Sequence, residues 1–294
     1  MTEDMSSQSE ASSGAEEHSL ESELLGTEAG PPAPLSTAEV EYILVALDMS
    51  PHSEAALAAA AELAAALRLE LRGLYVEDIN LLRLCGLPFG VEYGSFTAKP
   101  RRIEQNHLER EFRMQASLLR KIMAEVAGQK RITWSFQVVR GGVTDQLLEA
   151  ATSARMLSLG RVGRSPGKRT GTTAQTIAQR AQRPVVFQSR QRNLHGPYTV
   201  LYTGSPAAYR AVNLGMELSA QEESTLKVLA PTSELAEGAQ SFLVENYSNP
   251  NAVYEQAAAL RDLLAAIDRS GVVILPVEAA GWLDEIPLTV IIVP

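Results

Sequence analysis

The residues best suited to chemistry lie in the stretch SLGRVGRSPGKRTGTTAQTIAQRAQRPVVFQ, residues 158–188. An apolar run ends there in a glycine, and a loop of glycines, cations and hydroxyls leads into a helix-forming segment. Glycine lets the backbone approach a ligand closely, and the start of a helix offers unpaired N–H groups to an anion. Arginine and lysine beside those groups would hold phosphates, so the stretch indicates a phosphate site, unless it is a basic loop that is only solvated. The loop residues behind this hypothesis are Gly160, Arg161, Gly163, Arg164, Lys168, Arg169, Gly171, Thr172 and Thr173.

The elements that must position this loop follow a strand–helix–strand order. Residues 42–47 are typical of a buried strand, and Ser50 with Pro51 then starts an alanine-rich helix that reaches about residue 67. A second strand, residues 71–76, precedes an apolar, irregular insertion at about 79–103 and a helix over 104–128. A strand in ITWSFQVV, a turn at 140–142 and a helix over 143–154 lead to the strand MLSLG. The loop, a helix over 172–182 and the strand PVVFQS complete the unit.

This order predicts an α/β protein with a doubly wound, five-stranded parallel sheet. In such sheets ligands bind outside the carboxyl ends of the strands, where the winding direction reverses. Asp48, Val76 and the loop after Gly160 all follow or end a strand. We therefore expect them to converge on one binding site.

From Tyr198 the same order of elements restarts. We expect two such domains in tandem, over residues 39–192 and 197–294. In the second, Gly204 stands about where Asp48 stood, and ILPVEAAGW replaces the glycine-rich basic loop. The second domain should therefore keep the architecture and lack the pocket chemistry. Residues 1–38 are dominated by Ser, Glu, Gly, Ala and Pro, which predicts a disordered acidic tail.

The charge is segregated along the chain. The formal net charge is −9, yet 13 acidic residues precede the first cation, Arg68. Residues 151–216 hold ten Lys and Arg and no acid. This distribution argues against general nucleic-acid binding and favours a small anion or an acidic protein partner for the basic segment.

Composition also argues against several other function classes. No apolar run approaches the ~20 residues of a membrane-spanning helix, so we expect no membrane insertion. The chain has one cysteine, Cys85, which suits a reducing cytoplasm. The four histidines have no partners at metal-ligand spacing, so no metal site is expected. Because no catalytic constellation emerges either, we expect a protein that is not an enzyme.

Three segments of the chain resemble the universal stress protein family. ILVALDMSPHSEAAL is similar to the opening strand of that family with its Asp, and LYVED to its second strand. LGRVGRSPGKRTGTTAQTIAQRAQRPVVF is similar to its nucleotide loop and closing strand. The resemblance spans about residues 40–190, with a weaker copy over 198–294. ATP-binding members carry G-x2-G-x9-G-[ST], whereas here seven residues separate Gly163 from the closing pair Gly171-Thr172.

The resemblance implies two tandem Rossmann-like domains of the adenine nucleotide alpha hydrolase type. It implies an adenine side formed by Asp48 and Val76. It implies a ribose and phosphate side formed by Gly160, Gly163, Gly171, Thr172 and Thr173. The implied function is non-catalytic binding of ATP or AMP as a regulatory signal in stress adaptation.

Two other functions remain open at this level. One is a nucleotide-free scaffold or adaptor that uses the tandem domains as a protein-interaction surface. The other, slow ATP hydrolysis, needs a base and a metal ligand that the loop does not obviously supply. Strand edges and the apolar insertion also predict pairing, either between the two domains or between two chains as a homodimer.

Overall fold

The computed structural model describes residues 41–85, 87, 91–93, 100–102, 104–162, 170–188, 194–248, 250–267 and 270–294. The predicted acidic tail lies outside these residues, and so do Gly163, Arg164, Lys168 and Arg169 of the loop. Residues 40–294 belong to a single unit of the fold. We call residues 41–188 the first half and residues 194–294 the second half.

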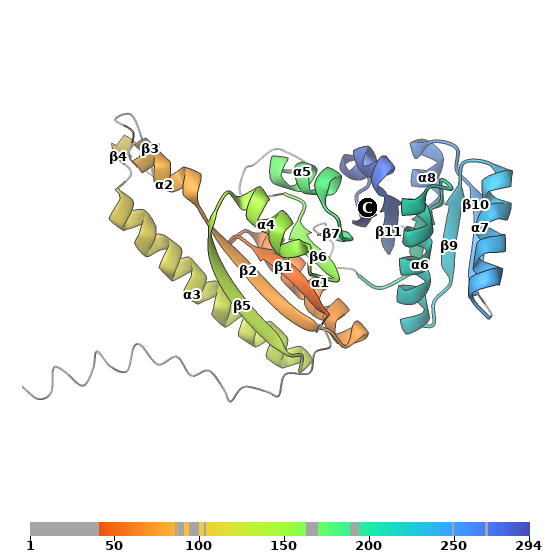
Figure 1. Cartoon of the computed structure of the whole chain (residues 1–294), viewed down its shortest axis with the longest axis horizontal. Helices are drawn as coiled ribbons and strands as arrows, with labels where there is room; N and C mark the ends of the chain where they lie inside the picture. The colour runs from red at the N-terminus through yellow and green to blue at the C-terminus, as the bar shows by residue number, and fades with distance from the viewer. Residues whose placement is uncertain are drawn as a thin grey trace, which may run out of the picture. The chain divides into compact units, whose positions relative to one another are not determined.

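The first half alternates strands and helices, with one insertion (Figure 1). Its elements are β1 (Tyr42–Leu47), α1 (Pro51–Leu67), β2 (Glu70–Asp78), α2 (Ile79–Cys85), β3 (Val91–Tyr93), β4 (Pro100–Arg102), α3 (Gln105–Lys130), β5 (Trp134–Gly141), α4 (Val143–Ala151), β6 (Met156–Gly160), α5 (Thr172–Arg180) and β7 (Val185–Gln188).

Two parts of the first half differ from the prediction. The insertion, expected to be irregular, contains helix α2 and the antiparallel pair β3–β4. The turn expected at 140–142 is wrong, because β5 continues through Gly141. There Arg140 pairs with Glu77 of β2 in the ladder, and its Nε donates a 2.8 Å hydrogen bond to the Glu77 carboxylate. This cross-strand ion pair extends both strands beyond their apolar segments.

The second half repeats the alternation in a shorter form. Its elements are β8 (Tyr198–Leu201), α6 (Pro206–Gln221), β9 (Leu226–Ala230), α7 (Ser233–Asn246), β10 (Ala252–Gln256), α8 (Leu260–Ala266), β11 (Val272–Pro276), the 3-10 helix η2 (Val277–Asp284) and β12 (Thr289–Val293). The sequence did not predict η2, which stands where the first half has the glycine loop and α5.

The strands of both halves form one ten-stranded sheet with the order β10-β9-β8-β11-β12-β7-β6-β1-β2-β5. Each half contributes five parallel strands in the same relative order, and the halves join where β7 pairs antiparallel with β12. Val186 lies opposite Ile291 at this junction, and neither is exposed. The sequence predicted one sheet in each domain and pairing of strand edges, either between the domains or between two chains. In the structure the edges of the two halves pair with each other: β7 and β12 are buried along their whole lengths, so one sheet continues through them.

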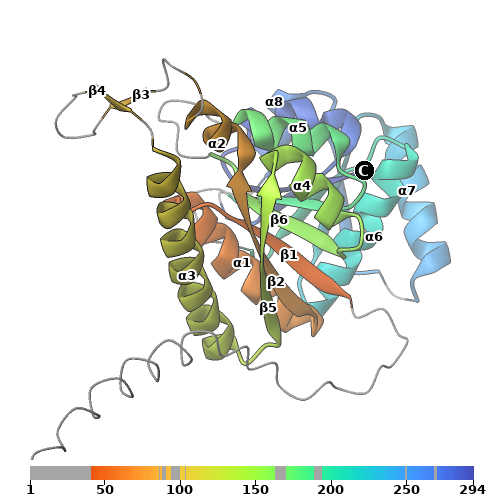
Figure 2. The ribbon, with the colours of Figure 1, turned by 60° about the vertical axis from the view of Figure 1, so that its left-hand side comes forward.

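Helices cover both faces of this sheet (Figures 1 and 2). One buried cluster packs α1 and α3 of the first half, and α6 and α7 of the second, against one face. The other cluster packs α4, α5, α8 and η2 against the opposite face. Because each cluster contains residues of both halves, the hydrophobic core runs without interruption across the junction.

The helices that open the two halves begin in the same way. Ser50 caps α1 by accepting a 3.1 Å hydrogen bond from the Ser53 amide, and Ser205 caps α6 in the same manner. The residue before each cap has a positive φ, 61° at Met49 and 79° at Gly204. Gly204 therefore corresponds to Met49, and the residue corresponding to Asp48 is Thr203, one position earlier than the sequence comparison suggested.

Candidate functional site

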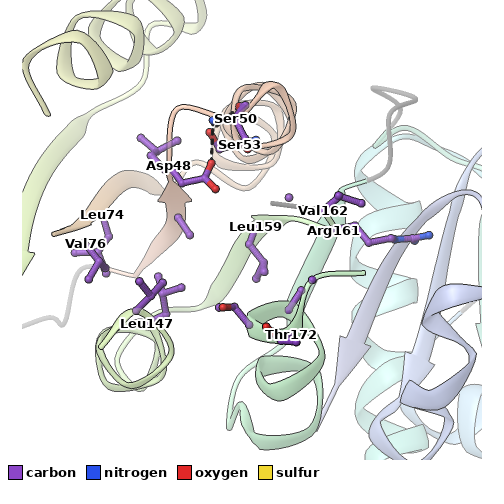
Figure 3. A pocket seen from close by; sticks show the side chains of 17 residues that line it. Asp48, Ser50, Ser53, Leu74, Val76, Leu147, Leu159, Arg161, Val162 and Thr172 are labelled. Atoms are coloured by element: carbon purple, nitrogen blue, oxygen red, sulfur yellow. Dashed lines mark hydrogen bonds between the residues drawn. The ribbon is translucent and has the colours of Figure 1, made fainter. Parts of the chain in front are cut away.

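A cavity of about 260 Å³ opens at the carboxyl ends of β1, β2 and β6 (Figure 3). The chain reverses its winding between β1 and β6, which are neighbours in the sheet, so the cavity lies where doubly wound folds bind ligands. The first turns of α1, α4 and α5 complete its walls. The predicted site residues within the described part of the chain all line it: Asp48, Val76, Gly160, Arg161, Gly171, Thr172 and Thr173.

One wall of the cavity is apolar. It is formed by aliphatic side chains from β1, β2, α4 and β6: Ala46, Leu74, Val76, Val143, Leu147 and Leu159. The sequence singled out only Val76 among these, because the others belong to ordinary buried strands and helices. A flat apolar wall of this kind can contact a planar ring, and apolar lining with a few polar groups is typical of small-molecule pockets.

Asp48 holds the turn that leads from β1 to α1. Its Oδ1 accepts a 3.0 Å hydrogen bond from the Ser50 amide, and its side chain is exposed at the rim of the cavity. This bond fixes the carboxylate beside the first turn of α1. The second carboxylate oxygen faces the cavity side of the turn, as Figure 3 shows for the Asp48 side chain.

The start of α5 supplies hydrogen-bond donors to the cavity. Gly171 is the N-cap and provides no side-chain cap, while the first intrahelical bond is donated by Gln175 to the Gly171 carbonyl. The amides of Thr172, Thr173 and Ala174 precede that bond, and all three residues line the cavity. Such amides, together with the helix dipole, favour an anion at this position.

The lack of a side chain at Gly160 serves packing against α1. A Cβ at this position would lie 2.7 Å from the Cβ of His52 and 2.9 Å from its carbonyl carbon. The end of β6 therefore approaches the first turn of α1 too closely for any other residue. Gly160 lines the cavity, but its missing side chain does not leave space for a ligand.

Arg161 is placed at the cavity by its backbone only. Its side chain is 7% exposed and points away from the cavity toward the second half (Figure 3). The guanidinium donates to the main-chain oxygen of Ile286 and, at 2.6 Å, to that of Leu288. Burial lowers the pKa of Arg161 to about 10, and the nearby carboxylate of Asp284 opposes this shift. From the sequence, Arg161 was expected to hold phosphates. Its burial and its hydrogen-bond partners could not be predicted, because they depend on contacts with distant parts of the chain.

The corresponding place in the second half contains one of the chain's own carboxylates. Glu278, from η2, accepts a 2.6 Å hydrogen bond from Thr203 Oγ1 and another from the N-cap hydroxyl of Ser205. Partial burial raises the pKa of Glu278, but these hydrogen bonds and the charge of Arg210 outweigh it, so the pKa lies below its ordinary value. No local pattern predicts this contact, because Glu278 and Thr203 are far apart in the chain.

Within the described residues, no group of three or more His, Cys, Asp or Glu side chains is arranged to hold a metal ion. None of the described helices combines the length and apolarity needed to cross a membrane.

A family model described as the universal stress protein family matches residues 39–187, half of the chain. The chain belongs to the universal stress protein family. The matched residues include β1, β2, β6 and α5, which are the elements that form the cavity.

Solved structures of the same family share the fold. A universal stress protein from Archaeoglobus fulgidus DSM 4304 is similar over 86% of this chain and 98% of its own, with a TM-score of 0.66 and 14% identity. A putative universal stress protein from Pseudomonas aeruginosa UCBPP-PA14 is similar over 88% of this chain and 95% of its own, with a TM-score of 0.52 and 12% identity. No curated protein matches the chain. The predicted α/β class with a mostly parallel, Rossmann-like sheet is thus confirmed.

Proposed function

We propose that the first half binds an adenine nucleotide, ATP or AMP, and acts as a non-catalytic regulator in stress adaptation. The observation that carries this proposal is the cavity at the winding reversal, which an apolar wall and the start of α5, with glycine as its N-cap, both line. A nucleotide has one chemical group for each of these surfaces: a planar base for the apolar wall and an anionic phosphate for the start of α5. Membership of the universal stress protein family supports the same assignment.

The residues of the cavity suit the two ends of such a ligand. The base would lie against Leu74, Val76 and Leu147, with the Asp48 carboxylate beside it as a hydrogen-bond acceptor for its amino group or for ribose hydroxyls. The phosphates would lie at the amides of Thr172 and Thr173. The role of Arg164, Lys168 and Arg169 as additional phosphate ligands stays a prediction from charge.

A second candidate function is that of a protein adaptor without a nucleotide. It is favoured by the second half, where Glu278 lies against the start of α6 and η2 replaces the loop and helix that form the cavity in the first half. Within its described residues, the second half therefore differs from the first at the place that corresponds to the cavity. An adaptor would bind its partner protein through other surfaces, so substitutions in the cavity would not change its affinity for that partner.

A pair of substitutions at Thr172 separates these functions. Thr172→Asp places a carboxylate in the first turn of α5, where it favours the helix dipole but repels phosphate. Thr172→Asn has a similar size and no charge, so it is the matched control. We expect Thr172→Asp to keep the melting temperature and to weaken ATP binding by about 100-fold, because the added carboxylate would repel the phosphates at close range.

The affinities would be measured by calorimetric titration with ATP and AMP. Wild-type protein and Thr172→Asn should bind at least one of them, and Thr172→Asp should not bind at the same concentrations. Equal affinity of all three proteins would place the phosphates elsewhere. The absence of binding to wild-type protein would favour the adaptor function.

A further inference from the structure

Arg161 connects the two halves at the edge of the cavity. From the end of β6, its side chain reaches the segment between η2 and β12 and donates to the carbonyls of Ile286 and Leu288. Both carbonyl-bearing residues are buried, with exposures of 0% and 5%. A buried guanidinium that serves two main-chain carbonyls is a fixed connection, because losing it would remove a donor from each of two buried carbonyls.

The backbone of the same residue closes the base of the loop. The Arg161 amide donates a 3.3 Å hydrogen bond to the Gln188 carbonyl at the end of β7. Its carbonyl accepts a 3.0 Å hydrogen bond from the amide of Gly171, the N-cap of α5. The position of the α5 amides relative to β6 therefore depends on Arg161, whose side chain is held by the second half.

A second contact joins the same elements. Gln175 of α5 donates a 3.4 Å hydrogen bond to the carboxylate of Asp284 at the end of η2. The apolar contacts between α5 and η2 belong to the core cluster that spans both halves. The segment 284–288 of the second half thus lies against both elements that flank the loop.

We propose that Arg161 is a positioning residue through which the second half sets the geometry of the phosphate end of the cavity, and through which ligand occupancy is transmitted to residues 284–288. This inference rests on the proposed function for its ligand. Coupling of this kind is reciprocal: if the second half orders the α5 amides for an anion, then the anion must order residues 284–288 to the same extent. The second half would then influence the affinity of a site to which it contributes no ligand contact.

The chain offers a matched control in Arg155, a second arginine that joins the halves. It precedes the opposite end of β6 and donates a 2.6 Å hydrogen bond to the carboxylate of Glu217 in α6. It also forms a 3.3 Å ion pair with Glu41. Arg155→Met removes a connection between the halves far from the loop, whereas Arg161→Met removes the connection that touches it.

The first experiment needs no nucleotide. Amide hydrogen exchange would be compared in wild-type protein, Arg161→Met and Arg155→Met by NMR. We expect Arg161→Met to accelerate exchange at Gly171 and Gln175 by about tenfold, whereas Arg155→Met leaves both unchanged. Equal exchange at these amides in all three proteins would overturn the positioning role. If Arg161→Met does not fold, Arg161→Lys is used, since lysine keeps the charge but cannot serve both carbonyls as a planar fork.

The second experiment adds ATP at saturating concentration. In wild-type protein and in Arg155→Met, ATP should slow amide exchange at residues 284–286 and at Leu288, and Arg161→Met should lose this response together with about tenfold in affinity. Binding of ATP without any response at 284–288 in wild-type protein would overturn the transmission. Failure of wild-type protein to bind either ATP or AMP would refute the proposed function, while the nucleotide-free exchange data would still decide whether Arg161 positions α5.

Discussion

The hydroxyl of Thr203 donates a 2.6 Å hydrogen bond to the carboxylate of Glu278, which lies beside the N-cap of α6. Thr203 occupies the position in the second half that Asp48 occupies in the first. In the first half, the same region opens into the cavity; in the second, an internal anion lies at the start of the helix. The two halves thus share a strand order but differ in what occupies the carboxyl ends of their central strands.

The contribution of Glu278 to stability should depend on pH. Since the folded pKa lies below the ordinary value of 4.5, the carboxylate stabilises the fold above that pH, and the effect is lost as the pH falls through the folded pKa. Glu278→Gln should therefore cost about 0.5 kcal/mol at pH 7, a small effect because the group is partly exposed to water. Urea unfolding of both proteins at pH 7 and at pH 3 measures the difference. A difference that persists undiminished at pH 3 would contradict this role.

Substitution of Gly160 should destabilise the fold whether or not a ligand binds. An added Cβ meets the backbone of His52 at 2.9 Å, and relief requires a shift of the first turn of α1. We expect Gly160→Ala to lower the free energy of unfolding by roughly 1–3 kcal/mol. The control is Gly281→Ala, because no atom lies within 4 Å of a Cβ built there. Equal stability of both variants in denaturant titrations would show that β6 and α1 are less closely packed.

The two halves should unfold together, because the sheet and both core clusters cross the junction. The chain contains two tryptophans, and they report separately: Trp134 is in β5 of the first half and Trp282 in η2 of the second. Single-tryptophan variants, Trp134→Phe and Trp282→Phe, would be unfolded in urea and followed by fluorescence. For each variant, we expect the urea midpoint measured by tryptophan fluorescence to equal the midpoint measured by far-UV circular dichroism. A separate transition for one half would mean that the β7–β12 pair does not couple them.

Much of the fold could be predicted from the sequence because local signals agreed with the final structure. The apolar run before Asp48, the Ser-Pro helix start and the glycine at the end of β6 give β1, α1 and β6 nearly residue by residue. The sequence predicted that strand edges pair, but left open whether between the halves or between two chains. It did not identify β7 and β12 as the pair, since an apolar strand such as β7 has the same composition at an edge as inside a sheet.

The cavity was predictable only in part. Strand ends and the start of α5 identified Asp48, Val76 and Thr172, because topology alone places strand carboxyl ends together. The sequence predicted that the side chain of Arg161 faces the phosphates, whereas it donates to two carbonyls. These acceptors could not be predicted, since they lie more than a hundred residues later in the chain. Glu278 was missed for the same reason: a contact between distant segments leaves no local pattern.

The stoichiometry of adenine nucleotide binding tests the central claim most directly. Calorimetric titration of the full chain with ATP, and separately with AMP, gives both affinity and the number of sites. We predict one site per chain, because the first half has the cavity with the start of α5 in its wall, while Glu278 lies at the corresponding position of the second half. Two sites per chain would contradict the difference between the halves, and no binding of either nucleotide would contradict the assignment of the cavity.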